Sequence, residues 1–295
     1  MATTEIRKIT PEITAKIHQY ELELKEHLIE DSTLRNNFIW HDIKNALGTV
    51  NYIGVSDNKL YRSYTHSESE WETSPDNLTA TVRVLRNLSK IAKAAKSAIL
   101  NYVREDEESP LAYLDSSDFS KYLAQVKLTP VLLRSTLFLN HPNEAFFQHL
   151  METKTDLRKI MMAAGIASEN LIVKDDASLE MNGAQTVIIF NLLHNAEKER
   201  YKYSHTDAGK TTPVGVFVSV DMNGISVINS ACNSFTPVLN PERIFPVPVD
   251  LDGISHCGLA IARVYARTTG TKLSYECLPS VGGFQITTHI KRPQK

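Results

Sequence analysis

Residues Phe38–Gly48 read F-I-W-H-D-I-K-N-A-L-G, and the rest of the sequence is organised around this stretch. On a helix, the apolar residues here and just beyond form one stripe: Ile39, Ile43, Ala46, Leu47, Val50 and Ile53. His41 lies on the opposite side, with Asp42 directly after it and Asn45 one turn later. A carboxylate can hydrogen-bond one imidazole nitrogen and leave the other free to react. The stretch therefore predicts a packed helix with a reactive histidine in solvent, although an ordinary surface histidine gives the same pattern.

Composition narrows the class of protein. The chain has 295 residues, enough for two domains, with 42% hydrophobic and 22% charged residues, as is typical of a soluble globular protein. Its formal net charge of −2 gives no overall basic field, so we expect no nucleic-acid partner. Three cysteines without metal-ligand spacing favour a reducing compartment. The sequence has neither a signal-peptide pattern nor a long apolar run, so we expect a cytoplasmic protein without a membrane segment.

The N-terminal part is expected to be helical. Residues 1–32 predict a helix, and residues 33–108 predict a hairpin whose first helix ends near Leu60. A polar loop is expected over residues 63–76, followed by a helix from Asn77 to Arg104. That second helix is apolar at Leu78, Val82, Leu85, Leu88, Ala92, Ala95 and Ile99. Stripes this broad exceed what one partner helix covers, so we expect a homodimer that forms a four-helix bundle.

The charged stretch Arg104–Pro110 marks a domain boundary, and residues 109–295 predict a second domain. A short helix is expected over Asp118–Val126, and Leu128–Gly165 is expected to be a mostly helical insertion broken at Pro142. Alternating apolar residues predict strands at 171–175, 214–220, 224–229, 272–277 and 283–290, with a turn at Asn223-Gly224 and a helix over 259–269. The fold class is therefore α+β.

A second motif lies in Ala184–Arg200, A-Q-T-V-I-I-F-N-L-L-H-N-A-E-K-E-R. On a helix, Asn191, Asn195 and Lys198 share one face, and the apolar residues Ile189, Leu192, Leu193 and Ala196 point to a core. Asparagine is a poor helix former, so two of them on one face favour a functional role. Amide oxygens suit a hydrated Mg²⁺ that also borrows phosphate oxygens, and a lysine suits the phosphates. The alternative is a plain solvated face.

Together the two motifs resemble a known family. N-L-L-H-N-A-E-K (191–198) is similar to the N-box of the ATP-binding domain of sensor histidine kinases and the wider GHKL ATPases. His41-Asp42-x-Lys44-Asn45 resembles their phosphoacceptor box, with Ala46 where the family usually has proline. Residues 241–245, 258–262 and 282–284 resemble later motifs of the same domain. The resemblance covers roughly residues 33–104 and 171–290.

The resemblance implies a fold and a set of roles. It implies a helical hairpin forming a dimeric four-helix bundle, followed by an α/β-sandwich GHKL ATPase-like domain that binds ATP and Mg²⁺. Asn195 would be the magnesium ligand, with Asn191 and Lys198 near the phosphates. His41 would accept the γ-phosphoryl group, Asp42 would orient and deprotonate it, and Asn45 would align a water for dephosphorylation. The implied partner is the receiver domain of a response regulator.

The chain departs from the family at its adenine-reading and glycine-rich boxes. Asn229-Ser230-Ala231-Cys232-Asn233 stands where the family has D-x-G-x-G, and only Gly258 remains of the phosphate-cradling G-x-G. A Cβ obstructs the close approach of backbone N–H groups to phosphate. Two phosphoryl-transfer functions thus stay open: a histidine kinase, favoured by the intact Asn195 box, and an ATP-independent histidine phosphotransferase, favoured by the lost glycines. A third possibility is a pseudokinase scaffold that binds a partner and does not use His41.

The second hairpin helix also carries a basic face. It consists of Arg83, Arg86, Lys90, Lys93 and Lys96. Such a face suits an acidic receiver domain, and an ordinary solvated helix gives the same pattern.

Overall fold

The computed structural model describes residues 47, 50, 58–73, 78–105, 116–140, 144–211, 215–232, 257–280 and 283–291. Its helices are α4 (Asn58–Thr73), α5 (Leu78–Glu105), α6 (Ser116–Asn140), α7 (Glu144–Glu152), α8 (Leu157–Ala164), α9 (Gly183–Ser204), α10 (Asp207–Thr211) and α12 (Cys257–Thr268), with a 3₁₀ turn η2 (Ser168–Asn170). Its strands are β1 (Thr155–Asp156), β2 (Leu171–Val173), β3 (Glu180–Met181), β4 (Val216–Val220), β5 (Gly224–Cys232), β6 (Lys272–Ser280) and β7 (Gly283–Lys291). The predicted α+β class is confirmed.

Five strands form one mixed sheet in the order β2-β4-β5-β7-β6. β2 runs parallel to β4, and the remaining neighbours in this sheet are antiparallel. A tight turn joins β4 to β5, where Asp221 Oδ1 accepts hydrogen bonds from the backbone N–H groups of Asn223 and Gly224. The predicted hairpin turn is confirmed. A Cβ on Gly224 would run into the carbonyl oxygen of Ile290, so the close approach of β7 requires glycine here.

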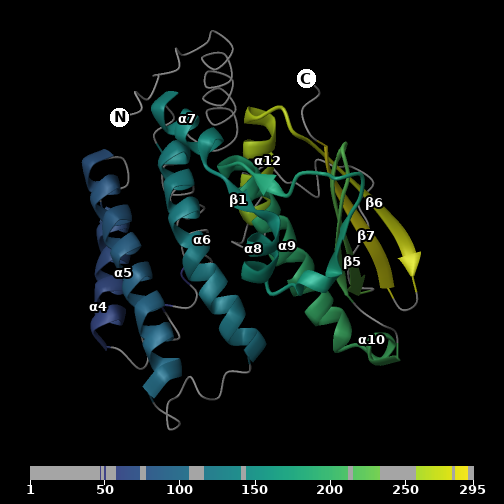
Figure 1. Ribbon diagram of the computed structural model, residues 1–295, viewed down its shortest axis with the longest axis horizontal. Coiled ribbons are helices and arrows are strands. Elements are labelled where there is room, and N and C mark those ends of the chain that lie inside the picture. The colour runs from purple at the N-terminus through teal and green to yellow at the C-terminus, as the bar shows by residue number, and fades with distance from the viewer. Residues whose placement is uncertain are drawn as a thin grey trace.

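One face of this sheet is the buried one. Along β5, Ile225, Val227, Asn229 and Ala231 are buried, whereas the residues between them are only partly buried. This period of two is that of a half-buried strand, and β4 shows it as well. α9 and α12 lie against this sheet, and Figure 1 shows both helices on the same side of it. A short antiparallel pair, β1–β3, lies apart from it and was not predicted.

α6 links the α4–α5 hairpin to the rest of the fold. It packs against α5 on one side and against α8 and α9 on the other, so the helices form successive layers beside the sheet (Figure 1). Two buried hydrogen bonds fix it: Gln125 Nε2 donates to the carbonyl oxygen of Ala163 in α8 at 2.9 Å, and the Tyr265 hydroxyl of α12 donates to the carbonyl oxygen of Ser135 at 2.7 Å. The apolar core accordingly runs without interruption from the hairpin to the sheet.

Two predictions for the helical part were wrong. Residues 63–73, expected in a polar loop, belong to α4, whose inner face buries Tyr64, Ser67 and Trp71. The helix expected to end at Val126 continues through Pro130 to Asn140 as α6. Pro130 lacks an N–H for the helix ladder, and the packing of α6 between two layers compensates for that lost hydrogen bond.

The apolar stripe of α5 is largely buried within one chain. Leu85, Leu88, Ala92, Ala95 and Ile99 are buried, because α4 and α6 both pack on α5. From the first motif, the structure describes Leu47 and Val50, and both are fully buried as expected. Two helices of the same chain thus cover the broad apolar stripe of α5, so the stripe does not require a second chain. The homodimer stays a prediction.

Among the helices of the described ranges, none is sufficiently long and apolar to cross a membrane.

The N-terminus of α9 provides a first test of the fold. Asn182 Oδ1 accepts a hydrogen bond from the Gln185 N–H at 2.8 Å, and Gln185 Oε1 accepts one from the Asn182 N–H at 3.0 Å, a reciprocal capping box. We expect Asn182→Ala to lower the free energy of unfolding by about 1 kcal/mol, since the Gln185 N–H loses its acceptor, the Asn182 side-chain oxygen. Urea denaturation followed by circular dichroism measures the change.

Asn182→Asp is the matched control, because a carboxylate caps the same N–H group. An equal loss in both variants would contradict the capping argument and point to packing around Asn182 instead.

Candidate functional site

The candidate site is built on α9, the helix predicted from the second motif. From Gly183 to Leu193 nearly every side chain of α9 is buried, because α7, α8, α12 and β5 all pack around it. Gly183 lies so close to α7 that an added Cβ would come within 2.6 Å of the Leu150 carbonyl oxygen. Beyond Leu193 the helix is buried only along a stripe. The three polar residues of the motif span this transition.

Asn191 lies on the buried side of the transition. Its side chain is 4% exposed, and its Nδ2 donates a hydrogen bond to the carbonyl oxygen of Val187 at 3.0 Å, one turn back in the same helix. This bond satisfies the amide within α9. The Asn191 side chain was predicted to lie near phosphates, but in the structure its Nδ2 is used in a hydrogen bond within the helix.

Asn195 and Lys198 lie on the open side. Asn195 is half-buried and Lys198 is exposed. Within the described ranges, neither side chain has a hydrogen-bond or ion-pair partner, so an amide oxygen and an ammonium one turn apart are both available to a ligand. An amide oxygen can coordinate a hard cation, and an ammonium can contact phosphate.

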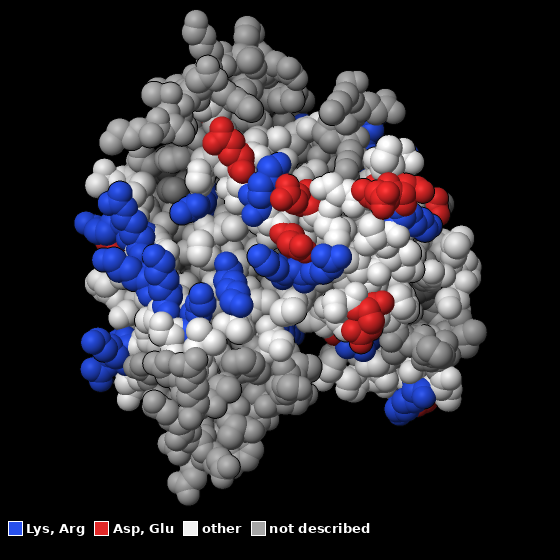
Figure 2. All heavy atoms as spheres, in the orientation of Figure 1, with Lys and Arg blue, Asp and Glu red and all other residues white. Residues whose placement is uncertain are grey.

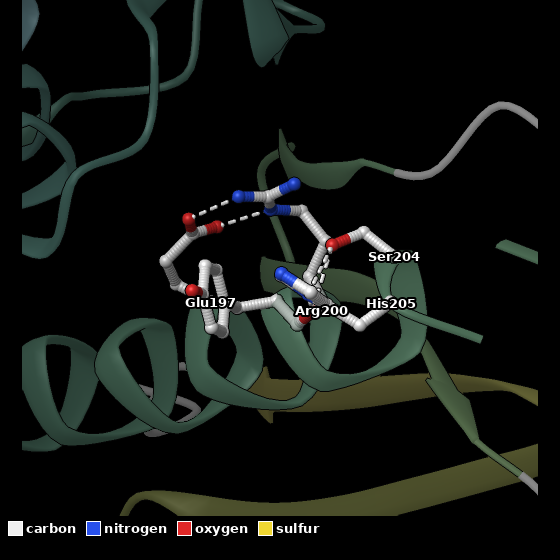
Figure 3. A network of polar contacts seen from close by, with 5 residues as sticks. Glu197, Arg200, Ser204 and His205 are labelled. Atoms are coloured by element: carbon white, nitrogen blue, oxygen red, sulfur yellow. Dashed lines mark hydrogen bonds and ion pairs between the residues drawn. The ribbon is translucent and has the colours of Figure 1, made fainter. Parts of the chain in front are cut away.

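The neighbouring cations of α9 are already paired. Arg200 donates two hydrogen bonds to Glu197, Nε to Oε2 at 2.7 Å and Nη2 to Oε1 at 2.6 Å, as Figure 3 shows. These hydrogen bonds raise the pKa of the Arg200 guanidinium above its usual value. Lys202 likewise pairs with Glu199 at 2.6 Å. Among the lysine and arginine residues of α9 after Leu193, Lys198 is therefore the one without an ion-pair partner in the described residues.

At the C-terminal end of α9, the residue that follows the helix, His205, contacts Tyr201. The His205 ring packs on Tyr201 at a centroid distance of 4.4 Å, and its Nδ1 lies 2.8 Å from the Tyr201 carbonyl oxygen (Figure 3). These contacts and the Glu197–Arg200 pair were not predicted. The three-residue spacing of Glu197 and Arg200 was the signal that could have identified the pair.

Asn229 lies on the buried face of β5, the face on which the helices pack. It is 6% exposed, stands opposite Val216 of β4 and Ile286 of β7, and its Nδ2 lies 3.3 Å from the Ser230 carbonyl oxygen that it can donate to. If the amide donates there, Oδ1 remains as an acceptor on an otherwise apolar part of the sheet. Such an acceptor suits an amino group of a bound ring.

Part of the predicted set lies on elements that pack against one another. Asn191, Asn195 and Lys198 belong to α9, which packs on β5, the strand of Asn229, and on α12, whose second residue is Gly258. Gly258 thus stands at a helix N-terminus, as the resemblance implied. His41, Asp42 and Asn45 lie outside the described residues. Within those residues no three His, Cys, Asp or Glu side chains cluster as metal ligands would, so Asn195 is the predicted metal contact that remains.

No model of a known protein family matches this chain, and no curated protein is significantly similar to it.

The two asparagines of α9 should differ in what they do for stability. Asn191→Ala is expected to lower the free energy of unfolding by about 1–3 kcal/mol, because it removes a buried hydrogen bond and leaves a small cavity. Asn195→Ala should stay within about 0.5 kcal/mol of the parent, because its amide has no partner among the described residues and alanine is a better helix former. Urea denaturation of both variants measures this difference. A comparable loss in Asn195→Ala would mean that this amide is structural too.

Proposed function

We propose that the chain is a histidine kinase of a two-component phosphorelay, which phosphorylates His41 from ATP and passes the phosphoryl group to an aspartate of a response-regulator receiver domain. The observation that carries this proposal is the open polar face of α9. Asn195 and Lys198 stand there without partners in the described ranges, while the adjacent cations Arg200 and Lys202 are paired with carboxylates. Because the adjacent cations are neutralised within the helix, Asn195 and Lys198 are the groups of this face that stay available to a ligand.

The side chains present fit a magnesium–phosphate group. Asn195 Oδ1 would contribute one neutral oxygen to a Mg²⁺ that keeps several waters, and the Lys198 ammonium would contact phosphate oxygens. Asn191 fits such a group less well, because its amide is bound to Val187. Bound Mg²⁺ would neutralise charge on the transferred phosphoryl group. The half-buried position of Asn195 restricts water on one side, which strengthens its interaction with a cation.

The protein's own groups supply the rest of the chemistry. In this proposal Asp42 would orient the His41 ring and take up its proton when the other ring nitrogen bonds to phosphorus. The bond between the γ-phosphorus and the bridging oxygen breaks as the new phosphorus–nitrogen bond forms, and ADP leaves. Asn45 would position a water for dephosphorylation, which releases inorganic phosphate. In this proposal Asn229 Oδ1 accepts a hydrogen bond from the adenine amino group, and Gly258 allows close approach at the start of α12.

The fold supports the same proposal in outline. A mixed five-stranded sheet with α9 and α12 on one face is compatible with a GHKL-type α/β sandwich. The α4–α5 hairpin is the part of the predicted 33–108 hairpin that the structure describes, and His41 precedes it in the sequence. We further propose that two hairpins associate as a four-helix bundle in a homodimer. The exposed apolar residues Tyr61 and Leu100 on the hairpin are available to such a partner.

A histidine phosphotransferase that needs no ATP is the second candidate. It is favoured by the neutral Asn229, which stands where the family has aspartate, and by the glycine-rich box, of which only Gly258 remains. Both differences from the family weaken nucleotide contacts, and neither affects His41. In a third alternative, a binding scaffold, neither His41 nor Asn195 would matter.

A labelling experiment separates these functions. The purified chain is incubated with γ-labelled ATP and Mg²⁺, and the label is tested for stability in acid and in base. We expect an acid-labile, base-stable label on the parent, no label on His41→Ala, and a loss of about 100-fold or more in Asn195→Ala, because losing Mg²⁺ coordination removes charge stabilisation worth several kcal/mol.

Nucleotide titration and receiver domains complete the test. Asn191→Gln is an unsuitable control because it disturbs the core, so Lys202→Gln, which removes only an exposed ion pair, serves as the matched variant and should be labelled normally. Absence of label and of ATP binding, together with transfer from a phosphorylated receiver domain to His41, would replace the kinase with the phosphotransferase. Absence of both reactions would leave the scaffold.

A further inference from the structure

A groove of about 950 Å³ runs between α4 and α5, away from the α9 site. His66 and Glu70 of α4 line one wall, and residues of α5 between Leu78 and Lys90 line the other. Its floor is tied together by Asn87, whose Nδ2 donates to the hydroxyl of Ser67 at 2.5 Å. The groove is thus a defined gap between two helices that are fixed to each other.

The groove changes character along its length. Near the start of α5 it is lined by Leu78, which is 44% exposed, by Thr79 and by half-buried Val82. Farther along the same helix it is lined by Arg86 and Lys90, both exposed. Leu78, Val82, Arg86 and Lys90 follow one another at four-residue steps, so they form one ridge about 18 Å long, apolar at one end and cationic at the other.

The charge at the cationic end is not neutralised by the chain. Arg83 forms an ion pair with Glu70 across the groove, which cancels the carboxylate that lines it. Within the described ranges Arg86 and Lys90 have no such partner. Figure 2 shows Lys and Arg side chains gathered at the left of the view, over the region that α4 and α5 occupy in Figure 1. An anionic group would therefore be attracted to this end.

We propose that the groove binds a small amphiphilic anion, a molecule with an aliphatic body and one phosphate or carboxylate head. The head would lie between Arg86 and Lys90, and the body would cover Leu78 and Val82. This inference is independent of the function proposed above, because none of the α9 residues takes part.

The lengthwise separation of apolar and cationic lining favours such a ligand over a protein helix. An amphipathic helix has its apolar and charged residues on opposite sides along its whole length, so it would need cations along the whole rim of the groove. Here the unpaired cations stand at one end only. A molecule that is charged at one end and apolar at the other matches this arrangement.

The proposal is tested by calorimetric titration of the full chain with dodecyl phosphate below its micelle concentration. Inorganic phosphate and dodecanol, which carry only the head or only the body, are titrated in parallel. We expect dodecyl phosphate to bind at least about tenfold more tightly than either, because the two parts of the groove contribute together.

Three variants locate the binding. Arg86→Gln with Lys90→Gln should weaken dodecyl phosphate by about tenfold or more, and Leu78→Gln by about fivefold. Leu78, Arg86 and Lys90 are exposed, so folding is not at risk. Lys93→Gln with Lys96→Gln, on the same helix but outside the groove, should leave the affinity within about twofold.

The proposal would be overturned if the Arg86/Lys90 double variant and the Lys93/Lys96 double variant lost the same amount of affinity. It would also be overturned if inorganic phosphate and dodecyl phosphate bound equally well. Either result would mean that anions bind to the basic surface in general and not to the groove. No binding of dodecyl phosphate, together with binding of a synthetic acidic helix that depends on Arg86 and Lys90, would identify a protein-docking surface and overturn it as well.

Discussion

The enclosure of α9 is the constraint on which the rest of the structure depends. Its first half is buried on all sides by helices and by the sheet, whereas its second half is buried along a stripe only. A helix placed this way needs apolar residues around its full circumference at one end and polar residues at the other, as its sequence provides. The transition between these halves is where Asn191, Asn195 and Lys198 lie, so the core and the candidate site share one helix.

The sequence was sufficient for the sheet and insufficient for α4. β4 and β5 show why, because one sheet face is buried and the other is not, which produces a period of two in their residues. α4 was missed because S-Y-T-H-S-E-S-E-W-E-T is polar. Its helical conformation is supported by the burial of Tyr64 and Trp71, and the hydroxyls of Ser67 and Thr73 find acceptors one turn back in the same helix. Local polarity indicated a loop, and tertiary packing overrode it.

For the candidate site, the sequence identified which face of the helix carries the polar residues but not how deeply each of them is buried. Spacing alone places Asn191, Asn195 and Lys198 on one side of α9, and it cannot say how many neighbours each residue has. Because other elements surround the first half of α9, Asn191 is internal and hydrogen-bonded to Val187, and only the later two residues face outward. Asn229 shows the opposite case, since a strand residue in an alternating run was predictable as inward-facing.

The parallel pairing of β2 with β4 has a consequence for the order of folding. The hairpins β4–β5 and β6–β7 join strands that are neighbours in the chain, whereas β2 reaches β4 only after β3, α9 and α10 have been traversed. The β5–β7 pairing also joins strands that are distant in the sequence. Closing a longer loop costs more entropy before any contact compensates for it, so we expect the β2–β4 and β5–β7 pairings to form after the two hairpins. Pulse-labelling hydrogen exchange would then find the β2–β4 amides protected after those of both hairpins, and simultaneous protection would contradict this order.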